Sequence, residues 1–315
     1  MIDPLNPSTN PLTNPALRAT ILALAVGFMT VEYALSRLAD RHEETHDLAE
    51  SAASLGVAFG QHVLRAVEAG LLAIPFAFVY QHRLLDFATA TPLALGALFL
   101  ASEFAYYWQH RASHRIRWMW ATHAVHHSAT KLNFSAAVRL GWTGTVSGNF
   151  LFLLPLVWIG FHPVAVLGML GINLLYQFFI HTEFARRLGP LEWVLNTPAH
   201  HRVHHASNAP CLDTNYGGIL IIFDRLFGSF AEAPKGEKLH YGLVGRAPTL
   251  NPIRIALGEW LAMFHDLRVT PSVSGKLRVL FAPPGFASQP GLRNHERPCP
   301  PPACIPQALG SGDQT

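Results

Sequence analysis

The feature that most constrains how this chain folds is a long segment without formal charge. No Asp, Glu, Lys or Arg occurs between Arg139 and Glu183. A helix of about 20 apolar residues is enough to cross the hydrocarbon core of a bilayer, so this segment is long enough to cross twice. Residues 160–163, Gly-Phe-His-Pro, lie near its middle and favour a turn. We therefore expect a membrane-embedded helical hairpin with arms at about 146–159 and 163–180.

The composition also indicates a membrane protein. Of the 315 residues, 50% are hydrophobic and 14% are charged, against roughly 25% charged residues in a typical soluble domain. The net charge of +3 is small, and the basic residues form no patch of the kind that binds nucleic acid, so no nucleic-acid partner is expected. The three cysteines form no Cys-x-x-Cys pair, which argues against a disulfide framework and a thiolate metal site.

Three further apolar segments, at about 16–35, 53–80 and 91–108, are candidates for membrane helices. With the hairpin, they predict an all-α integral membrane protein with about four to five transmembrane or membrane-embedded helices. Arg and Lys concentrate at 37–50, at 110–139 and after residue 181. Because cytoplasmic loops carry the excess of Lys and Arg, these regions are predicted to be cytoplasmic and the N-terminus to lie on the opposite side.

The domain organisation that we expect is a single membrane domain at 16–286. A polar, proline-rich segment precedes it at 1–15, without the basic region that begins a signal peptide. Residues 115–139 are polar, basic and aromatic, so we expect them at or outside the membrane interface. Residues 287–315 have a composition typical of a disordered tail.

Histidine is the anomaly of this composition. The chain has 18 histidines, and many of them lie at helical spacing, where residues three and four apart share a face of a helix. Three runs stand out: His110 and His114; His123, His126 and His127; and His201, His204 and His205. The third run follows Thr197 and Pro198, which favour a helix start as N-cap and first helical residue.

The number and type of these side chains predict a metal centre. Neutral imidazole is a ligand for iron, zinc and copper. Eight imidazoles are too many for one zinc ion, which takes about four ligands, and they suit two metal ions. Redox-active iron accepts a ligand set that is nearly all imidazole. Iron bound in this way could oxidise an unactivated C–H bond, because the metal supplies the chemistry of this step. We expect a helical, His-rich, metal-binding cap on the cytoplasmic face.

The residues around these histidines show a family resemblance. Three blocks, Tyr106–His114, Trp120–Ser128 and Asn196–His205, contain the runs, and shorter blocks lie at 177–184, 189–193, 215–218, 224–228 and 241–243. Together they resemble the fatty acid hydroxylase / sterol desaturase superfamily, and most of all its alkylglycerol monooxygenase-like branch. The resemblance is strong over about 93–243, which would be the catalytic core of a single membrane oxygenase domain, and weaker to 286.

The resemblance implies a non-haem di-iron centre that uses O2 and an external reductant to hydroxylate or desaturate a lipid carbon, or to cleave a C–O bond. It implies that the eight histidines of the three runs are the metal ligands and the catalytic residues, with His181 and His200 as candidates for a further ligand. Asn133 and Asp224 are expected to orient imidazoles through their free ring N–H groups; for Asn133, a role as a turn or cap residue is an equal alternative. The sequence departs from the family pattern at Glu103, where we expect Asp.

The sequence leaves the lipid and the electron donor open. The lipid could be an ether lipid, a sterol, an ornithine lipid, a carotenoid or a fatty acyl chain. The electron donor is expected to be a separate protein or a pterin, because no haem or flavin motif is present. The oligomeric state is not indicated.

Two other functions fit parts of the sequence. A His-rich membrane metal transporter would need ligands along a path through the membrane, whereas these histidines gather at one face. A zinc metallopeptidase is suggested by residues His42, Glu43 and His46, which fit the pattern H-E-x-x-H. No third zinc ligand follows at short range, and the segment is charged like a solvated connector.

Overall fold

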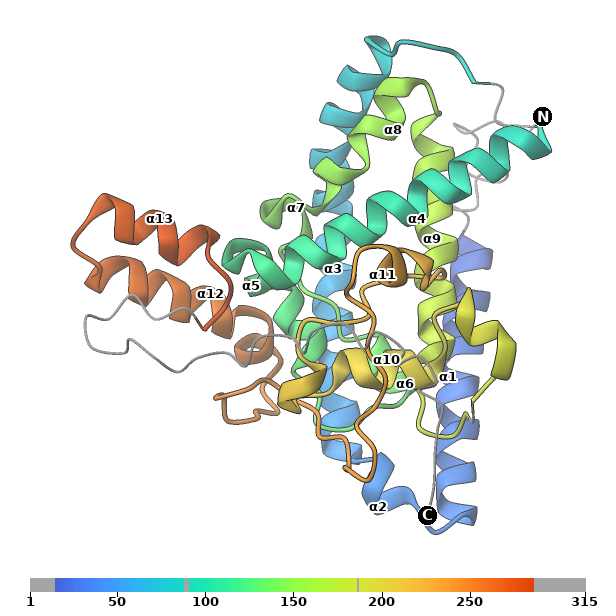
Figure 1. Cartoon of the computed structure of the whole chain (residues 1–315), viewed down its shortest axis with the longest axis vertical. Coiled ribbons are helices and arrows are strands. Elements are labelled where there is room, and N and C mark those ends of the chain that lie inside the picture. Colours follow the sequence, from blue (N-terminus) through green and yellow to red (C-terminus); the bar gives the residue numbers. More distant parts are fainter. Residues whose placement is uncertain (1–14, 88–90, 186, 286–315) are drawn as a thin grey trace, which may run out of the picture.

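The computed structural model describes residues 15–87, 91–185 and 187–285, which form helices and loops and no β-strand. Three long helices, α1 (Pro15–Leu38), α3 (Leu48–Gln81) and α9 (Pro163–Ile180), run along the length of the molecule, and α4 (Pro92–Arg115) crosses them obliquely (Figure 1). The predicted all-α architecture is confirmed for these residues. The predicted polar segment at 1–15, apart from its last residue, and the predicted tail at 287–315 lie outside the described residues.

Three helical segments are long and apolar enough to cross a membrane: Ala19–Leu38, His42–Gln81 and Pro163–Ile180. The last of them is the second arm of the expected hairpin. The first arm is broken into α7 (Gly144–Ser147), η1 (Asn149–Phe152) and α8 (Leu154–Ile159). Its apolar part, Asn149–Ile159, would extend about 16 Å as a helix, about half of the hydrocarbon core. This arm is therefore too short to cross alone.

The predicted segment at 91–108 is helical within α4, but it is not among the helices that are apolar enough to cross. Buried polar residues, including Ser102 and Glu103, face protein on this helix. The predicted number of four to five membrane helices and their orientation stay predictions. The three apolar segments are those of an integral membrane protein.

The turn of the hairpin packs against α3 and α4. Phe76, Leu98, Val157 and Phe161 are members of one buried apolar cluster at this place. Gly160 adopts φ 134°, and a Cβ at this position would lie 2.2 Å from the carbonyl oxygen of Leu85. Only glycine fits such a close approach of two backbones.

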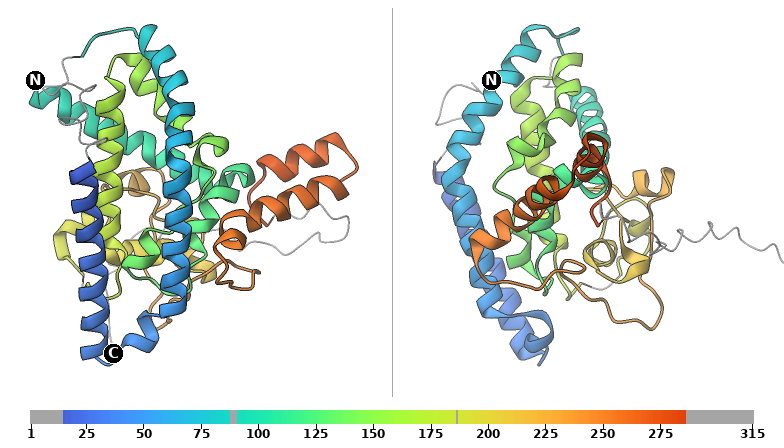
Figure 2. Two further views of the ribbon diagram at one scale, coloured as in Figure 1. Left: turned by 180° about the vertical axis from the view of Figure 1, so that it is seen from behind. Right: turned by 90° about the vertical axis from the view of Figure 1, so that its left-hand side faces the viewer.

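The remaining helices are α2 (His42–Thr45), α5 (Arg117–His127), α6 (Phe134–Ala137), η2 (Gly189–Trp193), α10 (Pro198–His205), η3 (Ala209–Cys211), α11 (Ile222–Leu226), α12 (Pro252–Val269) and α13 (Val273–Phe281). α10 begins at Pro198 with Thr197 as N-cap, as predicted. α12 packs on α5 and forms, with α13, an arm that projects from the bundle (Figure 2).

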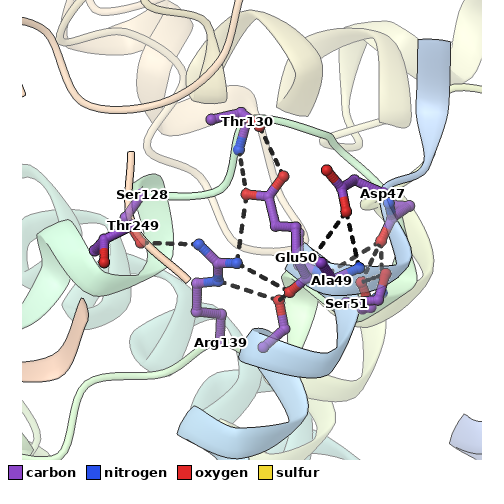
Figure 3. Close-up of polar contacts among 12 residues, drawn as sticks. Asp47, Ala49, Glu50, Ser51, Ser128, Thr130, Arg139 and Thr249 are labelled. Atoms are coloured by element: carbon purple, nitrogen blue, oxygen red, sulfur yellow. Dashed lines mark hydrogen bonds and ion pairs between the residues drawn. The ribbon is translucent and has the colours of Figure 1, made fainter. Parts of the chain in front are cut away.

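Arg139 lies inside the molecule, although we expected residues 115–139 at or outside the membrane interface. Its side chain is 1% exposed and forms an ion pair with Glu50 at 3.4 Å (Figure 3). It also donates to Ser54 Oγ at 3.1 Å and to Ser128 Oγ at 3.2 Å. Glu50 accepts in turn from the N–H of Thr130 at 2.6 Å. Because a buried charge needs partners, this pair ties the start of α3 to the loop that follows α5.

Candidate metal centre

Nine histidines gather in two adjoining groups. The five-histidine group contains His110, His114, His123, His127 and His204, and the four-histidine group contains His126, His181, His201 and His205. In each group, one ring nitrogen per residue lies within 4.8 Å of the others, and all of these residues are buried except the half-buried His123. The ring centroids of His127 and His205, one from each group, are 4.4 Å apart. Two adjoining sets of imidazoles are an arrangement that could hold two metal ions.

Helical spacing divides the histidines of one helix between the two groups. On α5, His123 and His127 join the five-histidine group, whereas His126 joins the other. Residues four apart differ by about 40° around a helix, whereas adjacent residues differ by about 100°. α10 repeats this division, with His204 in the five-histidine group and His201 and His205 in the four-histidine group. We expected the histidines of each run to share one face of a helix; in the structure, two of the three runs contribute to both groups.

The ring nitrogens within a group are spaced as ligands of one ion would be. His123 Nε2 lies 2.9 Å from His110 Nε2 and 3.1 Å from His127 Nε2. In the other group, His201 Nε2 lies 2.9 Å from the Nε2 of His181. Two ligands at right angles, each about 2.1 Å from an ion, are about 3.0 Å apart. A neutral ring nitrogen either donates one proton or presents one lone pair, so hydrogen bonds alone serve such a cluster poorly.

Backbone carbonyls set the tautomer of three of these rings. The Nδ1–H groups donate from His110 to Tyr216 O at 2.7 Å, from His181 to Gln177 O at 2.5 Å and from His204 to Thr214 O at 2.8 Å. A proton on Nδ1 leaves the lone pair of Nε2 free for a metal ion. The Nε2 atoms of His114 and His204 are buried and have no hydrogen-bond partner among the described residues. A metal ion would be the partner that such buried nitrogens need.

The electrostatic environment keeps these imidazoles neutral. Burial lowers the pKa of all nine rings below the ordinary value of 6.5, and it lowers the pKa of His181 to about 4. At most of them, the neighbouring imidazoles lower the pKa further, because a second positive charge in the group would be repelled. Neutral imidazole is the form that binds a metal ion.

Comparison with known proteins assigns a family to this arrangement. Residues 95–229, which contain both histidine groups, match the family model described as Fatty acid hydroxylase. The matched segment therefore resembles the fatty acid hydroxylase / sterol desaturase superfamily. The predicted superfamily is confirmed, and so is its alkylglycerol monooxygenase-like branch, to which the relatives below point.

Several curated proteins are similar to this chain. Alkylglycerol monooxygenase of Xenopus tropicalis is 40% identical over 206 residues, which are 65% of this chain and 45% of the relative. Alkylglycerol monooxygenase of Homo sapiens is 41% identical over 206 residues, with the same two shares of 65% and 45%. Ornithine lipid hydroxylase OlsE of Rhizobium tropici is 32% identical over 146 residues, 46% of this chain and 44% of the relative. The chain spans about half the length of these curated relatives. No solved structure matches it.

Asp224 supports one of the histidines through a loop and not by direct contact. We expected it to accept from an imidazole N–H, but its carboxylate accepts from Tyr216 N, Gly217 N and Ser229 Oγ, each at 2.7 Å. Tyr216 is the residue whose carbonyl oxygen accepts from His110. Burial raises the pKa of Asp224 to about 6, although these hydrogen bonds lower it. Asp224 therefore holds the loop that orients His110.

Glu103 anchors the same loop from the other side. Its carboxylate accepts from Ile219 N at 2.8 Å, from Leu220 N at 2.9 Å and from Asn173 Nδ2 at 2.5 Å. Glu103, which stands where we expected Asp, therefore connects α4, α9 and the loop at 215–220. Sequence reasoning missed Asn173. Its signal was available, because Asn173 and Gln177 are polar residues four apart in an otherwise apolar helix.

Two predicted residues have other roles. Asn133 contacts no histidine ring through a hydrogen bond in the described structure; its Oδ1 accepts from Ser135 N at 2.9 Å and caps α6. Asn133 therefore has the alternative role that we considered, that of a cap residue. His200 is buried but belongs to neither group, because its Nδ1 accepts from Thr197 N at 3.5 Å, at the start of α10. His181, the other candidate, lies in the four-histidine group.

The segment that fits H-E-x-x-H contributes to neither group. His42 begins the four-residue helix α2, and His46 follows this helix. His46 Nε2 lies 3.7 Å from Glu32 Oε2, a buried carboxylate of α1. Glu43 is exposed. Within the described ranges, no cluster suited to a metal ion includes these residues.

Proposed function

We propose that this protein is a membrane-bound non-haem di-iron oxygenase that uses O2 and an external reductant to hydroxylate or desaturate a lipid carbon. The observation that carries the proposal is the pair of adjoining histidine groups within the fatty acid hydroxylase segment. A ligand set of neutral imidazoles without thiolates suits a redox metal such as iron. Two iron ions, when bound, would supply the electrons and the O2 chemistry that side chains lack.

The side chains of this chain would hold, orient and isolate the two ions. The five-histidine group would bind one ion and the four-histidine group the other. At about six ligands per ion, both would keep positions open for O2, water or substrate. The carbonyl oxygens of Tyr216, Gln177 and Thr214 would hold three rings in the tautomer that binds metal. Burial of the groups would exclude water from the reaction.

The substrate that we propose is a membrane lipid. The names of the relatives describe them as a monooxygenase of alkylglycerol and a hydroxylase of ornithine lipid. Three apolar helical segments would keep the histidine groups close to a bilayer. We propose an ether lipid as the first lipid to test. The electron donor would be a separate protein or a pterin, and the catalytic face would be cytoplasmic.

The two alternative functions lack support from the geometry. A metal transporter needs ligands along the membrane segments, but none of the nine grouped histidines lies within the three apolar segments. A zinc metallopeptidase needs His42, Glu43 and His46 at a metal ion, but these residues join no cluster suited to one.

The proposal is tested with the purified, iron-loaded, full-length protein in detergent. Alkylglycerol, sterol, ornithine lipid and fatty acyl substrates are supplied with O2 and either a reduced pterin or a reducing protein. O2 consumption and oxidised lipid are measured by electrode and mass spectrometry. We expect lipid-dependent O2 consumption, and we expect His126→Ala and His204→Ala, one from each group, to lose turnover. His126→Ala, in the four-histidine group, should lose more iron than His204→Ala, in the five-histidine group.

Glu43→Ala is the control, because it removes the carboxylate of the H-E-x-x-H segment and should keep turnover and iron. Full activity in a metal-free preparation would refute the proposal. Loss of function in Glu43→Ala with an active His126→Ala would favour the peptidase. Flux of metal ions into proteoliposomes, without lipid oxidation, would favour the transporter.

A further inference from the structure

The arm formed by α12 and α13 has an inner face that packs on α5 and an outer face with exposed apolar side chains. On the inner face, Trp260 and Met263 of α12 and Val279 of α13 pack with Ala121 of α5 in one apolar cluster. Both helices run across the direction of α3 in two views (Figures 1 and 2). Helices that lie in the surface of a bilayer are expected to run across the helices that span it.

The outer face of the arm exposes more apolar side chains than we expect for a helical hairpin surrounded by water. Leu261 is 65% exposed, Val273 is 75% exposed and Leu277 is 52% exposed, and Phe264 and Phe281 are exposed as well. A groove of about 560 Å³ lies between the two helices, with Leu261, Phe264 and Leu280 among the residues that line it. This volume lies in the range of pockets that hold small amphiphilic ligands.

The charged residues of the arm indicate which charge a ligand of the arm would carry. The acidic residues of α12 and α13 are Glu259 and Asp266, and each is already neutralised by an arginine. Glu259 pairs with Arg246 and Asp266 with Arg117, both at 2.6 Å. This leaves no unpaired acidic side chain on the arm.

The basic residues of the arm are not neutralised in this way. Arg254, Arg268, Lys276 and Arg278 form no ion pair among the residues that the structure describes. Arg268 and Lys276 line the same groove as the apolar residues. Long basic side chains over an apolar groove suit a molecule with an anionic head and an apolar tail.

We propose that the α12–α13 arm binds the surface of an anionic bilayer, with an acyl chain of an acidic phospholipid in the groove and its phosphate beside Arg268 and Lys276. This contact would hold the histidine-bearing part of the protein on the membrane surface independently of the spanning helices. Each basic residue at an anionic surface contributes about 1 kcal/mol. Removal of two should therefore lower the ratio of docked to undocked arm about 30-fold.

The test places a spin label on the arm of the full-length protein in lipid nanodiscs. Leu277→Cys is labelled in a background with Cys299→Ser and Cys304→Ser, while the buried Cys211 is kept. The accessibility of the label to O2 and to a water-soluble nickel chelate reports its depth. The discs contain phosphatidylcholine with or without phosphatidylglycerol. A label at the exposed Val244, which precedes the arm, reports the level expected in water.

We expect the label at residue 277 to be more accessible to O2 than to nickel in discs with phosphatidylglycerol. Arg268→Gln combined with Lys276→Gln should abolish this preference. The matched control, Lys235→Gln with Lys238→Gln, removes the same charge from an exposed loop outside the arm and should keep it.

Three results would overturn the proposal. The label at residue 277 could be as accessible to nickel as the label at Val244, which would place the arm in water. It could be shielded from both O2 and nickel, which would mean that protein, including a second copy of this chain, covers the arm. It could also insert equally with and without phosphatidylglycerol, which would remove the role of the basic residues. None of these readouts depends on turnover or on the metal.

Discussion

The division of the histidines into groups of five and four predicts that the two metal sites respond differently to the loss of one ligand. His181→Ala would leave three imidazoles in the four-histidine group, below the number of about four that a stable metal site in a protein usually has. His110→Ala would leave four in the five-histidine group. We therefore expect His181→Ala to lose about one of two iron ions per chain, and His110→Ala to retain more of its iron.

The magnitude follows from the contacts of His181. Its Nε2 lies 3.1 Å from His126 Nε2 and 2.9 Å from His201 Nε2, and its ring is held by the carbonyl oxygen of Gln177. Loss of a residue that only orients a ligand lowers metal affinity about 10–100-fold. Loss of a ligand itself should exceed this, so we expect the affinity of the four-histidine group to fall at least about 100-fold, or about 2.7 kcal/mol.

The assay is a chelator titration of the purified protein, with iron per chain measured by mass spectrometry at each chelator concentration. His200→Ala is the matched control, because His200 is a buried histidine of the same region that belongs to neither group. It should retain both ions. Equal retention of iron by His181→Ala and wild type would refute the assignment of His181. Equal loss from His110→Ala and His181→Ala would refute the division into two unequal groups.

Three further predictions follow from the residues around the centre. Asp224→Asn should loosen the loop whose Tyr216 carbonyl orients a histidine, and should lower iron affinity about 10–100-fold in the same titration. Arg139→Ala leaves the buried carboxylate of Glu50 without its cation and should lower the free energy of unfolding by about 3–5 kcal/mol, whereas Arg187→Ala, in an exposed ion pair, should change it little in the same denaturation experiment. Burial lowers the pKa of the grouped imidazoles below 6.5 in the folded state, so the unfolded chain binds more protons below that pH. The free energy of unfolding of the metal-free protein should therefore fall as the pH drops from about 6.5 towards 4, and a value that stays constant or rises in this range would contradict the reasoning.

Local signals in the sequence predicted the parts of the structure that depend on neighbouring residues. The start of α10 at Pro198 follows from the preferences of Thr and Pro at helix starts. The second arm of the hairpin follows from the absence of charge at 163–180. The first arm could not be predicted as broken from hydropathy, because hydropathy does not record where Gly148, with φ 81°, interrupts the helix.

The roles of three polar residues were decided by the partners that they bond to in the fold. Arg139 looked like an interface residue, but Glu50, 89 positions earlier in the chain, neutralises it in the interior. Asn133 and His200 both looked like candidates for the metal centre, and both bond to the starts of helices instead. The bonded partners of Asn133 and His200 lie only two and three positions away, whereas the partner of Arg139 lies far away in the sequence.

The sequence by itself determined that several imidazoles would be presented on helices, because spacing of three and four residues sets their angles around each helix axis. It also showed the resemblance to the superfamily, through the blocks that surround the three runs. Only the tertiary structure decided which ring joins which group, that His181 completes the smaller one, and which carbonyl oxygens set the tautomers. The physical reason is that spacing fixes a side chain relative to its own helix, whereas a shared target depends on how α4, α5, α9 and α10 are rotated and placed relative to one another.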